Sequence, residues 1–114
     1  MKGDQLEMTL LFDYYGDLLT EKQRTCFDLY YNQDLSLSEI AEQAGISRQG
    51  VHDTLVRAEA QIGQFEAAVG CIARAQAVQQ AAETIEAAAS RLRGLPQAKA
   101  DAEVILLACR ALKE

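Results

Sequence analysis

The sequence predicts an all-α fold, and three observations support this prediction. The 114 residues contain seven glycines, one proline and no tryptophan, and they are rich in alanine and leucine. Apolar residues recur at three- and four-residue spacing along most of the chain. Residues 37–57, LSEIAEQAGISRQGVHDTLVR, have the pattern of two short helices joined by a glycine turn. We therefore expect a helix-turn-helix bundle, then a long C-terminal helix and a final helix that folds back on it.

Two helices are expected before this motif. The first covers about residues 4–19, with Asp4 as its N-cap. The second begins at Thr20, where Thr20 and Gln23 have the spacing of a capping box, and runs to about Asn32. Its first turn carries Lys22 and Arg24, which either contact a phosphate of the DNA backbone or form a solvated polar face. We expect three aromatic side chains of the first helix to pack in the core: Phe12, Tyr14 and Tyr15.

The helix-turn-helix has a physical reason at each key position. Ser36 and Glu39 form a second capping box, and Gly45 lies where a turn needs a positive φ. Ser47 caps the second helix, whose Val51 and Leu55 point into the core. One face of the first helix is expected to be buried through Ile40, Ala41 and Ala44.

The second helix of the motif leaves a polar face outward: Arg48, Gln49, His52, Asp53 and Arg57. In DNA-binding motifs of this kind the second helix lies in the major groove, with its N-terminal residues on base edges. The pattern thus makes this face the candidate binding surface.

Beyond Arg57 the helix is expected to continue through Gly63 and Gly70, which weaken it without demanding a break. Gly94-Leu95-Pro96 ends it, and a last helix follows over about residues 97–112. We divide the chain into a motif domain, 1–62, and a C-terminal extension, 63–114. An apolar seam along the long helix is either intramolecular core or a dimer interface: Ile62, Phe65, Val69, Ile72, Ala75, Val78, Ala82, Ile85, Ala89 and Leu92.

The charge distribution is unusual for a protein that binds DNA. The net charge is −6, of which residues 1–34 contribute −4, residues 35–62 contribute −2 and residues 63–114 contribute zero. Non-specific attraction to phosphate should therefore be weak, because it scales with the number of cations placed on the backbone.

Several classes of function are disfavoured. Cys26, Cys71 and Cys109 are odd in number and widely spaced, which argues against disulfides and zinc and favours small buried residues. His52 has no ligand partner nearby in the sequence, and no phosphate loop, dinucleotide motif or catalytic constellation occurs. We expect no enzyme, no metal and no cofactor. The absence of a long apolar run or an apolar leader predicts a cytoplasmic protein without a membrane span.

Three stretches carry a family resemblance: LLFDYYGDLLTEKQR, LYYNQDLSLSEIAEQAGISRQGVHDTLVRAE and QIGQFEAAV. They resemble the YlxM family of small bacterial helix-turn-helix proteins, and the motif is also similar to region 4 of bacterial sigma factors. The resemblance implies a sigma-region-4-like module, a tendency to dimerise and a regulatory link to the signal recognition particle pathway. Gly50 departs from the family's usual alanine, and no matching motif follows Val69.

Two functions compete. In the first, the chain is a dimeric regulator that binds double-stranded DNA. Ser47 would touch a phosphate, Arg48 and Gln49 would reach bases, and His52 would lie one turn further along. The residues that would hold the DNA backbone are Arg57, Lys22 and Arg24. In the second, the same fold binds a protein or RNA of the signal recognition particle machinery without reading DNA. A purely structural role would leave the outward face unused.

Overall fold

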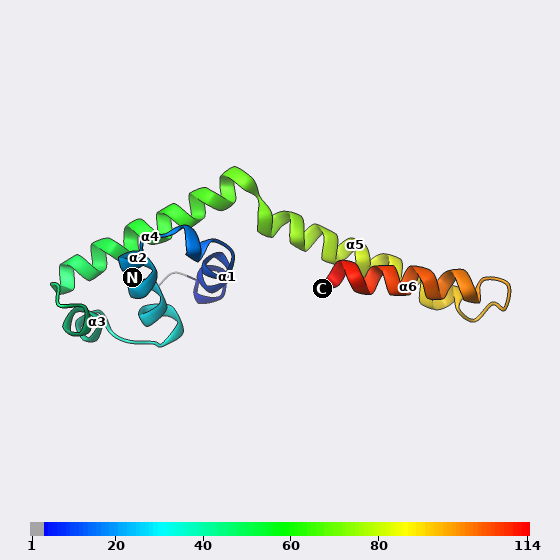
Figure 1. The fold of residues 1–114 in the computed structure, drawn as a ribbon, viewed down its shortest axis with the longest axis horizontal. Helices are drawn as coiled ribbons and strands as arrows, with labels where there is room; N and C mark the ends of the chain where they lie inside the picture. The colour runs from blue at the N-terminus through cyan, green and yellow to red at the C-terminus, as the bar shows by residue number, and fades with distance from the viewer. Residues whose placement is uncertain (1–3) are drawn as a thin grey trace. The chain divides into compact units, whose positions relative to one another are not determined.

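The computed structural model describes residues 4–114, which form six α-helices and no strand (Figure 1). The all-α prediction is confirmed. The chain divides into two compact units, Met1–Cys71 and Ile72–Glu114, each with its own packing. The helices are α1 (Gln5–Tyr15), α2 (Glu21–Phe27), α3 (Leu37–Ala44), α4 (Arg48–Val69), α5 (Cys71–Leu92) and α6 (Lys99–Lys113), with short turns η1 (Gly16–Leu18) and η2 (Asp28–Asn32).

The first unit is built around α4, against which α1, α2 and α3 all pack. An aromatic stack joins α1 to the segment after α2: the rings of Phe12 and Phe27 have centroids 4.7 Å apart, and those of Phe27 and Tyr31 are 4.6 Å apart. Burying a large apolar side chain stabilises a fold by roughly 1.5–3 kcal/mol. The largest fully buried side chains all belong to this unit: Tyr31, Phe27, Ile40, Leu55, Ile62, Val51 and Cys26.

The first helix is shorter than predicted. It is capped by Asp4 as expected, but it ends at Tyr15, and Gly16–Leu18 form a tighter 3₁₀ turn. Tyr14 is 46% exposed, which corrects its assignment to the core, because the face that meets the rest of the unit runs through Leu11 and Tyr15.

The second helix begins with the predicted capping box, in which Gln23 N donates to Thr20 Oγ1 at 3.1 Å and Thr20 N donates to Gln23 Oε1 at 3.0 Å. After Phe27 it widens into a π-helical turn, since Gln33 N donates to the carbonyl of Asp28 five residues back. The Asp28 carboxylate also accepts from the side chains of Asn32 and Gln33. Sequence periodicity did not predict this widening.

The predicted continuous helix through Gly70 is wrong. Gly70 has φ +61°, and its N–H donates to the carbonyl of Glu66, so α4 ends at Val69. The Tyr15 hydroxyl donates to the Glu66 carboxylate and accepts from Cys71 N at 3.2 Å. The side chain of Tyr15 thus satisfies a free N–H at the start of α5 and also binds Glu66 near the end of α4. Burial and the Glu66 hydrogen bond raise the pKa of Tyr15 to about 12.

The second unit is a hairpin of α5 and α6, in which α6 lies beside α5 (Figure 1). The predicted folding-back is confirmed by the ion pair between Lys113 Nζ and Glu86 Oε2 at 3.4 Å. The side chains buried between the helices are small ones: Ala82, Ala89, Ala102 and Cys109.

The predicted apolar seam is only partly buried. Val78, Ile85 and Leu92 remain 38–44% exposed, whereas Ala82 and Ala89 of the same seam are buried. Alanine allows two helices to approach closely, so the contact line runs through the small residues and the larger ones lie at its flank. The prediction that all three cysteines are buried is also corrected, because Cys71 is exposed. Within residues 4–114, no helix is long and apolar enough to cross a bilayer.

Candidate nucleic-acid interface

The turn between α3 and α4 has the geometry that the sequence predicts. Ser36 and Glu39 exchange capping hydrogen bonds of 3.1 and 3.0 Å at the start of α3. Hydrogen bonding to the Glu39 carboxylate, by the Ser36 backbone amide first and by the Ser36 side chain second, holds the pKa of Glu39 below its usual value. Gly45 ends the helix with φ +69° and ψ +29°. Ser47 then caps α4, its Oγ accepting from Gly50 N at 2.9 Å.

The inner faces of these helices form the core that holds α4 in place. Val51, Leu55 and Ala58 are fully buried, and so is Ile40 of α3. Ala44 is exposed, which corrects its predicted place on the buried face, because α3 ends there and the chain turns away. The outer face of α4 is consequently fixed in orientation by packing rather than by its own polar contacts.

The outer face presents the predicted residues to solvent. Arg48 and Gln49 are exposed in the first turn of α4, Arg57 is exposed further along, and His52 is half-buried. Ser47 is exposed as well, although its hydroxyl oxygen already accepts the capping bond. The structure thus brings Ser47, Arg48 and Gln49 together at the N-terminus of α4.

A small polar cluster occupies the middle of this face. Gln49 Nε2 donates to Asp53 Oδ1 at 2.9 Å, and His52 Nδ1 lies 3.4 Å from the same oxygen. Hydrogen bonds from Gln49 and then His52 hold the pKa of Asp53 below its usual value, so this carboxylate is ionised at neutral pH. Sequence reasoning noted the charge of Asp53 but missed its contact with Gln49, which the four-residue spacing on a helix could have indicated.

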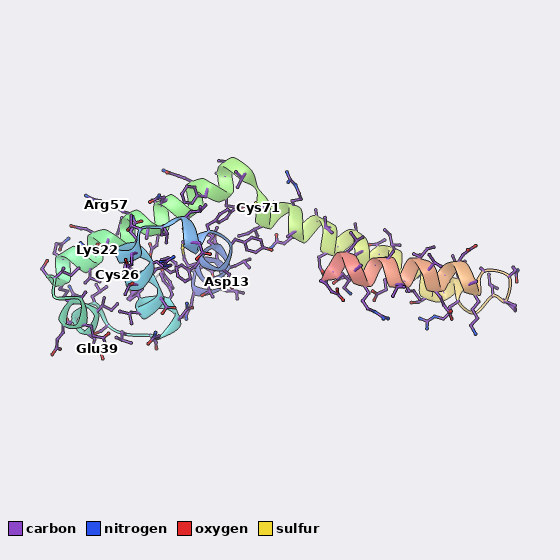
Figure 2. The ribbon with its side chains drawn as sticks, viewed as in Figure 1. Asp13, Lys22, Cys26, Glu39, Arg57 and Cys71 are labelled. Carbon is purple, nitrogen blue, oxygen red and sulfur yellow. The ribbon has the colours of Figure 1, made fainter. Side chains whose placement is uncertain are left out.

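The two cations of α2 differ in their surroundings. Lys22 lines a shallow depression together with Ala44 at the end of α3, so it lies near the turn of the motif. Arg24 Nη1 instead lies 3.6 Å from the carboxylate of Asp17. Figure 2 labels Lys22 of α2 and Arg57 of α4, and the hydrogen bond from Gln23 to Gln61 shows that these two helices are neighbours.

The chemistry of this surface is that of recognition by hydrogen bonds and charge. In the described part of the chain, no group of three or more His, Cys, Asp or Glu side chains could hold a metal ion. Cys26 lines the same depression as Lys22, and burial raises the pKa of its thiol. The motif offers guanidinium, amide and imidazole groups in a row along one helix.

Comparison with known proteins identifies the fold family. A family model described as "UPF0122: Putative helix-turn-helix protein, YlxM / p13 like" matches residues 2–102. The chain belongs to the UPF0122 family. The match extends the resemblance seen in the sequence well into the C-terminal hairpin, where no shared motif was recognised. Membership of this family is consistent with the helix-turn-helix geometry of α3 and α4.

Individual relatives in the UPF0122 family are similar over most of their length. A UPF0122 protein of Thermoanaerobacter sp. (strain X514) is 54% identical over 78 residues, covering 68% of this chain and 67% of the relative. One from Caldanaerobacter subterraneus subsp. tengcongensis is 48% identical over 86 residues, covering 75% and 74%. One from Halalkalibacterium halodurans is 43% identical over 90 residues, covering 75% and 83%.

Proposed function

We propose that this helix-turn-helix protein is a cytoplasmic regulator that binds double-stranded DNA through α4. The observation that supports this most is the first turn of α4. Arg48 and Gln49 are exposed there, on a helix whose opposite face is fully buried at Val51 and Leu55. A helix held in this way can enter the major groove without rearranging the core.

Each predicted residue has a chemical role in this proposal. Arg48 would read guanine through a bidentate hydrogen bond, and Gln49 would read adenine. Ser47 and the N-terminus of α4 would contact a phosphate, with His52 one turn further along the same face. Three cations would hold the backbone: Lys22, Arg24 and Arg57.

The charges limit how strongly the protein can bind DNA non-specifically. The proposal assigns four cations to the DNA: Arg48, Arg57, Lys22 and Arg24, of which Arg24 already lies 3.6 Å from the Asp17 carboxylate. Even if all four neutralised a phosphate, the slope of log K against log salt concentration would be only about −4. Affinity must therefore come from a preferred sequence rather than from general attraction to DNA.

The first test is selection of duplexes from a random pool, followed by titration of the enriched duplex at several salt concentrations. Arg48→Ala should weaken binding by about 5- to 150-fold, since one bidentate base contact is worth roughly 1–3 kcal/mol. Arg74→Ala, on α5, is the matched control and should bind as the unmodified protein does. Failure to enrich any sequence, or equal binding by Arg48→Ala, would overturn the proposal.

A second candidate function is an interaction module for a component of the signal recognition particle machinery, protein or RNA. It is favoured by the acidic balance of residues 1–62 and by the ionised Asp53 in the middle of the α4 face, which opposes DNA phosphate. Titration with the purified protein and RNA components separates the two candidates. If the protein is an interaction module, Arg48→Ala should still bind the protein or RNA component, and the selection should enrich no DNA duplex.

We also propose that the C-terminal extension, residues 63–114, mediates homodimer formation. Val78, Ile85 and Leu92 recur every seven residues on α5 and stay 38–44% exposed, and Ile105 and Leu112 of α6 are 37% and 58% exposed. Apolar residues at this spacing are typical of helices that pack against helices of a second chain.

Sedimentation velocity tests dimer formation. Ile85→Glu should shift the protein to a monomer, because it places a charge in the centre of the apolar row. Leu107→Glu is the control. Leu107 is 64% exposed, and by the count of about 100° per residue it lies on the side of α6 away from Ile105 and Leu112. A monomeric unmodified protein, or a dimer that survives Ile85→Glu, would contradict the assignment.

A further inference from the structure

A second candidate site lies on the α5–α6 hairpin. A groove of about 330 Å³ runs between the two helices, with three cationic side chains, one carboxylate, one hydroxyl and one leucine along its walls. These lining residues are Glu86, Ser90, Arg93, Leu106, Arg110 and Lys113. None of them belongs to the helix-turn-helix surface, and the proposed function gives them no role.

The groove and the exposed apolar row lie on different sides of the hairpin. Counted from the buried Ala89 at about 100° per residue, Ser90 falls on one flank of α5. Arg93 follows the end of α5, but its N–H still donates to the carbonyl of Ala89, so the same count places it on that flank. Ile85 and Leu92 fall on the opposite flank by the same count. A second copy of the chain that covers the apolar row therefore leaves the groove open to another partner.

The cations of the groove are not all neutralised. Lys113 Nζ lies 3.4 Å from the carboxylate of Glu86. Across residues 4–114, by contrast, neither Arg93 nor Arg110 has a carboxylate within 4.0 Å, and both side chains are exposed. Two guanidinium groups thus face a groove with unused hydrogen-bond donors. Guanidinium groups bind carboxylates and phosphates through paired hydrogen bonds.

We infer that this groove binds an acidic segment of a partner protein, with a carboxylate of the segment between Arg93 and Arg110. The surroundings favour a protein over a phosphate chain. Glu86 lies inside the groove, and residues 72–114 carry five Asp and Glu side chains against six Lys and Arg. A nucleic-acid strand needs a track of cations, which this mixed surface does not provide. The half-buried Leu106 adds an apolar contact that suits a peptide side chain.

Nitrogen-15 NMR titration of the full chain tests this inference, because it detects weak binding and locates it. The probe is an acetylated, amidated hexapeptide that alternates glutamate with leucine, and its control is the same peptide with glutamine. The glutamate peptide should shift the amide signals around Arg93 and Arg110 and bind about tenfold more tightly than the glutamine peptide.

The variants separate this site from the proposed DNA surface. The double variant Arg93→Ala, Arg110→Ala should weaken binding of the glutamate peptide by about tenfold and leave binding of the DNA duplex unchanged. Arg74→Ala with Arg91→Ala is the matched control, since both arginines lie outside the groove, and it should change neither. Arg48→Ala should leave peptide binding unchanged, so a failure of the DNA proposal is distinguishable from a failure of this one.

Three results would overturn the inference. The first is no shift at millimolar glutamate peptide, and the second is equal binding of the glutamine peptide. The third is a single-stranded RNA that shifts the same signals and displaces the peptide, which would assign the groove to phosphate.

Discussion

Substitution of glycine by alanine should have opposite effects on the free energy of unfolding at two positions of the first unit, Gly45 and Gly63. Gly45 and Gly63 both have open space where a Cβ would stand, with no atom within 4 Å. Gly45 has φ +69°, whereas Gly63 lies inside α4 and has no positive φ. Any difference between Gly45→Ala and Gly63→Ala therefore arises from backbone conformation and not from steric conflict.

The magnitudes follow from the conformations. A left-handed conformation costs an L-residue roughly 1–2 kcal/mol, and the smaller entropy of unfolded alanine returns about 0.4–1 kcal/mol. Gly45→Ala should thus lower the free energy of unfolding by about 1 kcal/mol. Gly63→Ala should raise it by about 0.5–1 kcal/mol, the usual advantage of alanine over glycine inside a helix.

The assay is urea denaturation followed by near-ultraviolet circular dichroism. All four tyrosines, Tyr14, Tyr15, Tyr30 and Tyr31, lie in the first unit, so this signal reports that unit alone. The free energies of unfolding of the two variants should differ by about 1.5–2 kcal/mol, because the two effects have opposite signs. Two shifts of the same sign would refute the argument that φ at Gly45 sets the cost.

Three further predictions concern the core, the helix junction and pH. Leu55→Ala should lower the free energy of unfolding by about 2–5 kcal/mol in urea, because Leu55 is fully buried; a loss below about 1 kcal/mol would contradict its place in the core. Tyr15→Phe should cost about 1–3 kcal/mol by the same measurement, since the Glu66 carboxylate and a backbone N–H lose their partner; an unchanged midpoint would deny the hydroxyl a structural role. The pKa of Glu39 is held below 4.5 in the folded state, so its contribution to stability is present above that pH and is lost as the pH falls through the lowered pKa. Glu39→Gln keeps a capping partner for Ser36 and should flatten this part of the pH dependence in urea titrations between pH 3 and pH 6, roughly the range in which a carboxylate titrates; an unchanged profile would exclude Glu39 as its source.

The helix-turn-helix was predictable because its signals are local. Capping boxes at Thr20 and Ser36 and a left-handed glycine at Gly45 depend on residues within a few positions of one another. Their bonds appear in the structure as the sequence indicates. The outward placement of Arg48 and Gln49 follows from the same helical period that buries Val51.

The features that sequence reasoning missed depend on distant contacts. The helix ends at Gly70, and the hydroxyl of Tyr15 contacts both sides of this break. It donates to the Glu66 carboxylate and accepts from Cys71 N, although Tyr15 lies more than fifty residues earlier in the sequence. The π-helical turn depends on side-chain bonds to Asp28 that compete with regular spacing. The exposure of Ile85 depends on which residues face α6, and the spacing within α5 alone does not determine this.

The candidate sites were likewise only partly predictable from the sequence. Spacing located the polar face of α4 but not the bond between Gln49 and Asp53. The groove on the hairpin joins Arg93, directly after α5, to Arg110 of α6, which is 17 residues later, so no short motif in the sequence indicates it.

The unequal burial of the three thiols makes the protein suited to site-selective labelling. Cys26 and Cys109 are 1% and 2% exposed, whereas Cys71, directly after the Gly70 break, is open to solvent. A maleimide should therefore modify Cys71 in the native protein and reach the other two thiols only on unfolding. A fluorophore or spin label at this single natural position would report on the junction between α4 and α5 while DNA, peptide or a second copy is added, without any engineered cysteine.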